Sequence, residues 1–281
     1  MSKARINICI PTYKRTRFLI DLIKSINASW ECYKAQSHDN RLSLKVFIID
    51  NDSESNNLFH IKFKFPLLLP HLTYQVNSAN IGIERNILKA IEYGLLDSHP
   101  HEYSYIWTIG DDDLVSNRAF IDIERAIFEE ESSLPALIIC SESPSCCPLE
   151  LVTGRYSGYG SAIDKFDKHY PQRPIHHTLM SLNIFRSDIY NRILAVQSLG
   201  TLYPQMYGMV FNDKLKHEPV IHLPPNQISL RQDTEGFHDK RLYKEVPFRW
   251  TEYYTKLRCF FKPYNDGKTL KSALKSDYWP D

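Results

Sequence analysis

The sequence predicts an α/β fold with a mostly parallel sheet flanked by helices, and two observations lead to this prediction. Short apolar runs alternate with segments of helical spacing through the first half of the chain, as in parallel sheets covered by crossover helices. Four of the apolar runs are followed by polar clusters, which read PTYKR, DNDS, NSANIG and DDD. Ligands bind beyond the carboxyl ends of the strands in such sheets, so the four clusters predict one binding edge.

The first half of the chain is predicted to alternate strands and helices. Ile6 to Ile10 is an apolar run that Pro11 stops, and Thr16 can cap a helix through Asn27 with its apolar residues on one face. Residues 29–43 are polar and irregular, which indicates a loop. The other elements expected here are strands at 44–49, 72–76, 105–109 and 137–140, a helix at 83–96, and a helix capped by Ser116 that runs to about residue 130.

The second half of the chain is less regular. Residues 141–178 contain Pro, Gly, Ser and His and indicate a long, mobile excursion. Beyond it, the pattern predicts a strand at 181–185, helices at 187–197 and 203–211, and a short strand at 220–223. Residues 240–263 mix aromatic and basic side chains at roughly helical spacing.

Composition excludes several classes of protein. Hydrophobic residues are 43% and charged residues 24% of the 281 positions, which is typical of a globular domain. A formal net charge of +1 argues against a nucleic-acid partner, and no apolar run reaches the length of roughly 18 residues that a membrane span needs. The six cysteines form no CxxC pair, so we expect reduced thiols and a cytoplasmic location.

The stretch YIWTIGDDDLV at 105–115 carries the most specific chemistry. Carboxylates packed this closely repel one another, and burying them without a counter-charge is expensive. Mg²⁺ or Mn²⁺ prefers one or two carboxylates, with water and substrate phosphate in the other positions, so the triplet predicts a cation site at the end of a strand. The alternative interpretation is a solvated acidic turn.

Other polar residues at the predicted edge have a ligand role and a structural alternative. Asp50 directly follows an apolar strand, where its carboxylate can accept from a nucleobase N–H or a ribose hydroxyl, or can instead cap the strand in an Asx turn. Gly82 lets the backbone approach a ligand or simply makes a turn. Arg15 and Arg85 are placed to pair with phosphate, or else are surface arginines.

Four segments in order, INICIPTYKR, VFIIDNDS, NIGIERN and YIWTIGDDDLV, resemble the nucleotide-binding half of a GT-A (Rossmann-like) glycosyltransferase of family 2 over residues 5–125. With SLNIFRSDIY further on, the WTIGDDD form is similar to O-antigen transferases of the abequosyltransferase type. The resemblance implies transfer of a sugar from a nucleoside diphosphate donor to a hydroxyl of a glycan or lipid-linked glycan of a bacterial surface polysaccharide or lipopolysaccharide. It divides the chain into a nucleotide-sugar-binding half (1–140), an acceptor-binding half of the same domain (141–239) and a C-terminal basic, aromatic tail (240–281).

The same resemblance implies the residues of the donor site. Asp113, with Asp111 beside it, is expected to bind Mn²⁺ or Mg²⁺, and a C-terminal histidine, His217, His222 or His238, is a further ligand candidate. The residues implied to contact the nucleotide sugar are Pro11, Thr12, Asp50, Arg85, Asp111 and Asp112. Their place in the same strand-end clusters adds Tyr13, Arg15, Asn80 and Gly82 to the predicted donor site.

A catalytic base is not assigned by the resemblance. Many inverting members carry an acidic pair at the start of a helix in the second half, and its aspartate takes the proton of the acceptor hydroxyl. In this region the chain reads LGTLYPQMYGMVFND, and Gln205 cannot take a proton. The candidates are Asp188, Asp213, and His177 or its neighbour His176. The alternative role of Asp188 is capping of the following helix, and the histidines are equally compatible with a loop or with contacts to the acceptor.

Two other functions are also weighed against the sequence pattern. A sugar nucleotidyltransferase would favour a glycine-rich phosphate loop after the first strand, where PTYKRTR has no glycine. A nucleotide-sugar-binding subunit without turnover is compatible with Gln205. The tail interleaves Lys and Arg with Phe, Trp and Tyr, which predicts either peripheral membrane contact near a lipid-linked acceptor or a packed helix with a solvated basic face.

Overall fold

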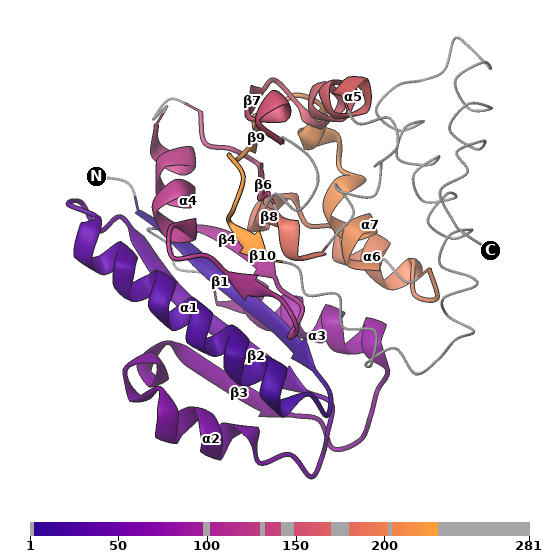
Figure 1. Ribbon diagram of the computed structural model, residues 1–281. Coiled ribbons are helices and arrows are strands. Elements are labelled where there is room, and N and C mark those ends of the chain that lie inside the picture. Colours follow the sequence, from indigo (N-terminus) through magenta and orange to yellow (C-terminus); the bar gives the residue numbers. More distant parts are fainter. Residues whose placement is uncertain are drawn as a thin grey trace, which may run out of the picture.

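A computed structural model describes residues 3–97, 102–129, 133–141, 149–169, 180–201 and 204–229. Within them a sheet runs in the strand order β3-β2-β1-β4-β8-β6-β9-β7, with helices on both faces (Figure 1). The strands of this sheet are β1 (Lys3–Thr12), β2 (Leu42–Asp50), β3 (Leu72–Val76), β4 (Glu102–Thr108), β6 (Leu137–Ile139), β7 (Gly154–Tyr156), β8 (Asn183–Arg186) and β9 (Val220–His222). The predicted α/β class with a mostly parallel sheet is therefore confirmed.

The helices cover two separate apolar cores, one on each face of the sheet. The α-helices are α1 (Thr16–Gln36), α2 (Asn57–Lys64), α3 (Ile83–Leu96), α4 (Ala119–Phe128), α5 (Tyr159–His169), α6 (Arg192–Gln197) and α7 (Pro204–Val210). Alternate residues of β1 and β4 point to opposite faces: Ile8 and Trp107 pack with α1 and α4, whereas Cys9 and Ile106 pack with α3, α5 and α7. Burial on both faces explains why these strands read as unbroken apolar runs.

The first half of the fold follows the sequence closely, with three corrections. Helix α1 continues to Gln36 through residues expected to be a loop, because Ser29, Trp30 and Tyr33 extend its buried face. The short helix α2 and a 3₁₀ turn at Pro66–His71 were not predicted. Helix α4 begins at Ala119 without a side-chain cap, and Ser116 contributes its main-chain oxygen, which accepts from Ala119 N at 3.2 Å.

The second half differs more from the sequence prediction. The predicted irregular excursion contains β7, α5 and a 3₁₀ turn at Leu149–Val152 in its described part. The single helix expected at 187–197 is a 3₁₀ turn, Ser187–Ile189, followed by α6, and Asn191 rather than Asp188 caps α6 by accepting from Leu194 N at 3.0 Å. Two further 3₁₀ turns lie at Met180–Leu182 and Asp213–Lys216.

Strand β8 joins the second half of the chain to the sheet of the first half. It lies between β4 and β6 and is antiparallel to both, whereas β9 is parallel to β6. A separate antiparallel pair joins β5 (Leu114–Val115), directly after the aspartates, to β10 (Ile228–Ser229). Two elements of the second half are thereby placed beside the aspartate turn.

Candidate active site

The register of the parallel strands brings the predicted polar clusters to one edge. Thr12 at the end of β1 is paired with Asp50 at the end of β2, and Asp50 in turn is paired with Val76 at the end of β3. On the other side of β1, Cys9 is paired with Thr108, the last residue of β4. The loops after these four strands therefore start at the same edge, as the sequence pattern predicts.

Asp111 is the most deeply held carboxylate of the aspartate turn. It is 5% exposed, and its two oxygens accept from Thr12 Oγ1 at 2.7 Å and from Arg15 Nη1 at 3.1 Å. The same Arg15 nitrogen donates to Asp112 Oδ2 at 2.9 Å, so one guanidinium bridges two carboxylates. Arg15 stands at the start of α1 after Lys14, whose φ of 56° turns the chain there.

Asp113 is held from the other half of the chain. Its carboxylate accepts from Ser181 Oγ, which itself accepts from Gly110 N at 2.9 Å. Space at Gly110 is tight, because a Cβ there would lie 2.9 Å from Asp112 Oδ1 and would displace that carboxylate. Trp107 Nε1 fixes the same serine by donating to its main-chain oxygen at 2.8 Å. Ser181, which the sequence did not point to, is thus the residue that joins the aspartate turn to the segment before β8.

Charge is balanced locally at this edge. Burial raises the pKa of Asp111, while the hydroxyl of Thr12 and the guanidinium of Arg15 oppose that rise. Burial lowers the pKa of Arg15, but Asp111 and Asp112 outweigh it and raise that pKa, so the guanidinium stays charged. The turn therefore holds carboxylates close together beside a permanent cation. In this arrangement a metal ion can replace Arg15 as the partner of the carboxylates, and Arg15 can then pair with phosphate.

In this structure Asp50 forms the Asx turn that was the alternative to a ligand role. It is fully buried, and its oxygens accept from Asp52 N at 3.0 Å, from Asn57 Nδ2 at 2.9 Å and from the hydroxyl of Tyr74. The bond from Asp52 N is the Asx turn that closes the strand end. A contact between Asp50 and a nucleotide stays a prediction, and it would require Tyr74 or Asn57 to move.

The loop after β3 is fastened to the end of β2 by side-chain amides. Asn51 Nδ2 donates to Asn80 Oδ1 at 2.5 Å, and Asn51 Oδ1 accepts from Ile81 N at 2.9 Å. Gly82 follows with φ +83°, a conformation that favours glycine, and is the cap residue before α3. Arg85 is exposed in the first turn of that helix. The loop is thereby held rigidly with its glycine and its arginine at the predicted edge.

Pro11 and Tyr13 flank Thr12 at the end of β1. Pro11 is half-buried within the strand, and Tyr13 is 41% exposed with the Nζ of Lys14 lying 5.4 Å from its ring centroid. An exposed ring beside a cation at this edge offers a surface for stacking a base. The contacts of these residues with a nucleotide stay predictions.

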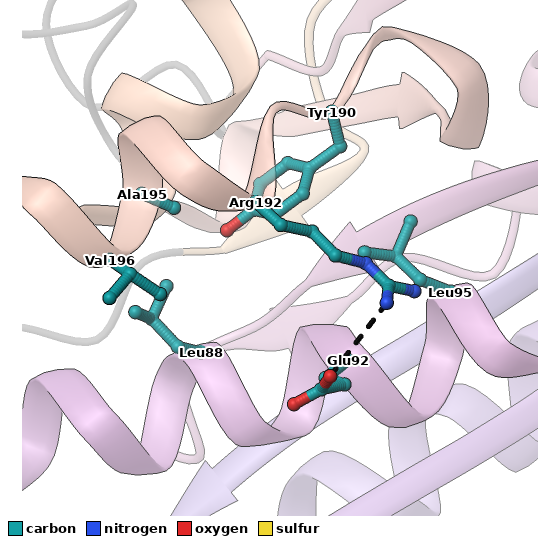
Figure 2. Close-up of a pocket in the computed structure, with 7 residues that line it drawn as sticks. All are labelled: Leu88, Glu92, Leu95, Tyr190, Arg192, Ala195 and Val196. Carbon is teal, nitrogen blue, oxygen red and sulfur yellow. Dashed lines mark ion pairs between the residues drawn. The ribbon is translucent and has the colours of Figure 1, made fainter.

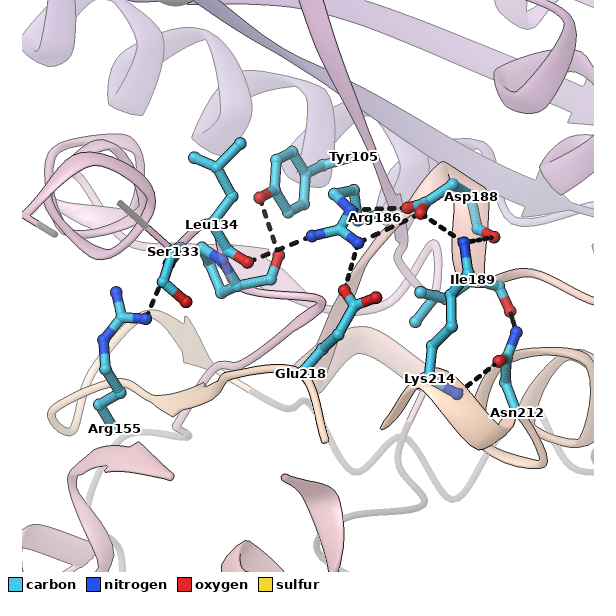
Figure 3. A network of polar contacts seen from close by, with 11 residues as sticks. Tyr105, Ser133, Leu134, Arg155, Arg186, Asp188, Ile189, Asn212, Lys214 and Glu218 are labelled. Carbon is cyan, nitrogen blue, oxygen red and sulfur yellow. Dashed lines mark hydrogen bonds and ion pairs between the residues drawn. The ribbon is translucent and has the colours of Figure 1, made fainter. Parts of the chain in front are cut away.

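Asp188 and Asp213 do not reach the aspartate turn. Arg186, the last residue of β8, is paired with Tyr105 in the middle of β4. Because β8 runs antiparallel to β4, Asp188 lies two residues further toward the amino edge of the parallel strands. Figure 3 shows it between Arg186 and Lys214, with Oδ1 2.6 Å from Arg186 Nε and Oδ2 2.9 Å from Lys214 Nζ. Asp213 pairs with Lys216 at 2.8 Å and its side chain is 84% exposed. His177, the third candidate base, and His238 lie outside the described residues.

The start of α7 holds a buried glutamine instead of an exposed acid. Gln205 is 6% exposed and lines a small cavity with Thr108, at the end of β4, and Asn183, at the start of β8. A larger pocket lies between α3 and α6, lined mainly by apolar side chains, with Arg192 reaching across to Glu92 (Figure 2). None of the residues predicted to bind the nucleotide lines either cavity.

The aspartate turn fits a hard divalent cation in part. Mg²⁺ and Mn²⁺ need one or two carboxylates, which Asp111 and Asp113 supply, with water and phosphate completing the shell. Among the described residues no group of three or more His, Cys, Asp or Glu side chains is arranged to hold a metal. His217 is exposed and His222 is buried, with burial lowering the pKa of His222 to about 4. The donor set therefore suits a site completed by substrate rather than a closed protein cage.

Comparisons with known proteins agree with the motif resemblance. No family model matches the chain. It is similar to the abequosyltransferase RfbV of Salmonella typhimurium, 26% identical over 293 residues that cover 96% of this chain and 79% of that protein. Among solved structures it resembles S. aureus TarS 1–349 in complex with UDP, with a TM-score of 0.55, 13% identity, and 98% and 76% of the two chains covered. The complex of TarS 1–349 with UDP-GlcNAc gives a TM-score of 0.53 and 13% identity over 92% and 71% of the two chains. These likenesses confirm the predicted GT-A fold.

Proposed function

We propose that the chain is a glycosyltransferase that moves a sugar from a nucleoside diphosphate donor to a hydroxyl of a bacterial surface polysaccharide or lipopolysaccharide. The observation that carries the proposal is the aspartate turn at the carboxyl edge, tied to Thr12 and Arg15 in the first half and to Ser181 in the second. Similarity to an abequosyltransferase, and the fold shared with a protein solved with UDP and UDP-GlcNAc, support it.

In the proposed reaction the bond between the anomeric carbon and the phosphate oxygen breaks. A bond from that carbon to the acceptor oxygen forms, and the acceptor proton passes to a base. The fixed carboxylates and Arg15 contribute mainly position and charge, which is the usual protein contribution to such transfers. A bound Mn²⁺ or Mg²⁺, held by Asp111 and Asp113, would neutralise charge on the leaving nucleoside diphosphate.

His177 is retained as the proposed base. Asp188 and Asp213 are held at the amino edge by Arg186, Lys214 and Lys216, away from the aspartate turn. A base at His177 predicts that His177→Ala removes the acidic limb of the pH profile of turnover. His177→Ala with an unchanged profile would exclude it.

A nucleotide-sugar-binding subunit without turnover is the second candidate function. It is favoured by Gln205, a residue that cannot act as a base, at the start of α7. Slow hydrolysis of the donor in the presence of Mn²⁺ separates the two functions, because a binding subunit raises its melting temperature with donor but releases no sugar.

A thermal-shift panel of UDP-, CDP- and GDP-sugars, each with and without Mn²⁺, tests donor class and metal dependence together. We expect one base to raise the melting temperature, more so with Mn²⁺, and the rise to vanish in Asp113→Ala. Asp213→Ala is the matched control, since that carboxylate is exposed at the other edge. A panel without any shift in the unaltered chain would contradict the proposal.

Membrane association is a separate matter. No helix among the described residues is both long and apolar enough to cross a bilayer. The tail at 240–281, for which the sequence predicts peripheral membrane contact, lies outside the described residues. We keep that contact of the tail as a proposal.

A further inference from the structure

Helix α2 presents two phenylalanines to solvent. Phe59 is 70% exposed and Phe63 is 82% exposed. They are four residues apart and so share one helix face, while Asn57 and Ile61 are buried on the other. One exposed aromatic residue needs no explanation, but two adjoining ones on a helix indicate a contact surface.

The charged side chains of α2 itself are of one sign. Lys62 and Lys64 are exposed on either side of Phe63, and neither forms an ion pair within the part of the chain that the structure describes. Residues 55–83 contain no Asp or Glu, so no acidic side chain of this segment offsets the two lysines. An aromatic pair flanked by lysines without acids matches an anionic surface better than a basic or neutral one.

The position of α2 leaves this face open. The helix lies at the outer side of β3, the edge strand of the sheet, and away from α5, α6 and α7 (Figure 1). Its first residue is tied to the binding edge, because Asn57 Nδ2 donates to Asp50 Oδ2 at 2.9 Å. A binding partner on the exposed face of α2 would therefore lie beside the loops that follow β1, β2 and β3.

We propose that this α2 face, formed by Phe59, Lys62, Phe63 and Lys64, binds the surface of an anionic lipid bilayer. The rings enter the boundary between headgroups and acyl chains, and the ammonium groups contact lipid phosphates. The buried side chains of α2, Asn57 and Ile61, keep their contacts with the rest of the protein, so binding requires no unfolding. This inference goes beyond the proposed function and does not depend on donor binding.

Sedimentation of the full chain with vesicles tests the proposal. We expect it to bind vesicles containing phosphatidylglycerol at least about tenfold more tightly than vesicles of phosphatidylcholine alone. Phe59→Ser with Phe63→Ser is expected to weaken that binding at least about tenfold. Each of Lys62→Gln and Lys64→Gln should weaken it about fivefold at low salt. Ile193→Ser is the matched control, because Ile193 is 71% exposed on α6 and should have no effect.

Three results would overturn the proposal. They are equal binding to both kinds of vesicle, unchanged binding by the double phenylalanine variant, and self-association of the unaltered chain that this variant abolishes, which would make the face a dimer interface. The thermal shift produced by the donor should persist in the double variant. A lost vesicle response is thereby distinguished from a failure of the proposed transferase function.

Discussion

The amino and carboxyl edges of the sheet both carry aspartate and arginine, but the two edges arrange these charges differently. At the amino edge Arg186 and Lys214 face Asp188 and Glu218, two cations against two carboxylates, and they join β8 to the loops before β6 and β9 (Figure 3). At the carboxyl edge three consecutive aspartates share Arg15 and two hydroxyl groups. The matched charges at the amino edge hold parts of the fold together, whereas the aspartates at the carboxyl edge form the proposed binding site.

The pKa shifts at the two edges run in opposite directions. Burial opposes ionisation of Asp188, but hydrogen bonds from Arg186 and Lys214 prevail and lower its pKa. At Asp111 burial prevails and the pKa is raised. A buried carboxylate whose pKa is raised, at an edge predicted to bind a ligand, is typical of a functional residue. A carboxylate whose pKa is lowered by neighbouring cations is typical of a structural ion pair.

The strongest test of this contrast is Asp113→Ala. We expect turnover to fall at least about 100-fold, because the fixed charge at the donor phosphates is lost. The melting temperature should change little, since removing one of three neighbouring carboxylates also removes repulsion. Turnover assays and thermal melts check this, with Asp213→Ala as the control. Full activity in Asp113→Ala would place the donor elsewhere.

Ser181→Ala breaks the contact between the aspartate turn and the second half. We expect turnover to fall about tenfold and the free energy of unfolding to fall by about 1–3 kcal/mol, because Gly110 N and Asp113 lose a buried partner. Ser161→Ala, at an exposed serine of α5, should change neither quantity. Denaturant unfolding and steady-state kinetics provide the readings. If turnover were kept while stability fell, Ser181 would be structural alone.

Arg15→Met examines whether guanidinium and metal compete for the same oxygens. Asp111 and Asp112 lose their bridging cation, so Mn²⁺ binding without nucleotide should tighten several-fold, by roughly 1 kcal/mol. Calorimetric titration with Mn²⁺ measures the change. Arg17→Met serves as the control, since Arg17 is exposed on the same helix. Weaker Mn²⁺ binding in Arg15→Met would show that Arg15 supports the metal rather than opposing it.

Asp188→Asn should have the smallest effect, and on stability alone. Because the folded pKa of Asp188 lies below its ordinary value of about 3.9, its carboxylate stabilises the fold above that pH and stops doing so as the pH falls through the lowered pKa. We expect the variant to lose about 1 kcal/mol near pH 7 and less than that near pH 3, below the ordinary pKa of the group. Urea unfolding at both pH values checks this. Loss of turnover at unchanged stability would revive Asp188 as a base.

The first half of the fold was predictable because its strands are buried on both faces. The bounds 72–76 and 83–96 agree with β3 and α3, and the other strands differ by a few residues. Helix α2 was not predicted, because Phe59 and Phe63 are apolar but exposed and so interrupt the alternation of apolar and polar faces that marks a helix. In the second half the strands are short. The strand expected at 181–185 is present as β8, but its antiparallel insertion between β4 and β6 depends on long-range pairing, which leaves no signal in the local sequence.

The candidate site was predictable where the chemistry is local. The triplet and the strand-end clusters meet at one edge because parallel register requires it. Ser181 was missed because its contact with Asp113 spans 68 positions of sequence. The sequence allows Asp50 to be a ligand or to form an Asx turn. In this structure it forms the turn with Asp52 N, while Tyr74, 24 positions away, donates to its other oxygen. Such distant partners cannot be read from a strand and its own loop.

The placement of β8 bears on how the chain acquires its shape. Residues 183–186 must find β4, some 80 positions earlier, and β6 before the central sheet is continuous. Pairings this far apart in sequence carry a large loop-closure entropy and slow the search for the native state. During synthesis the first four strands emerge well before their antiparallel neighbour, so the flank of β4 stays uncovered until the ribosome has passed residue 186. A chaperone that shields an unpaired strand edge would act at that stage.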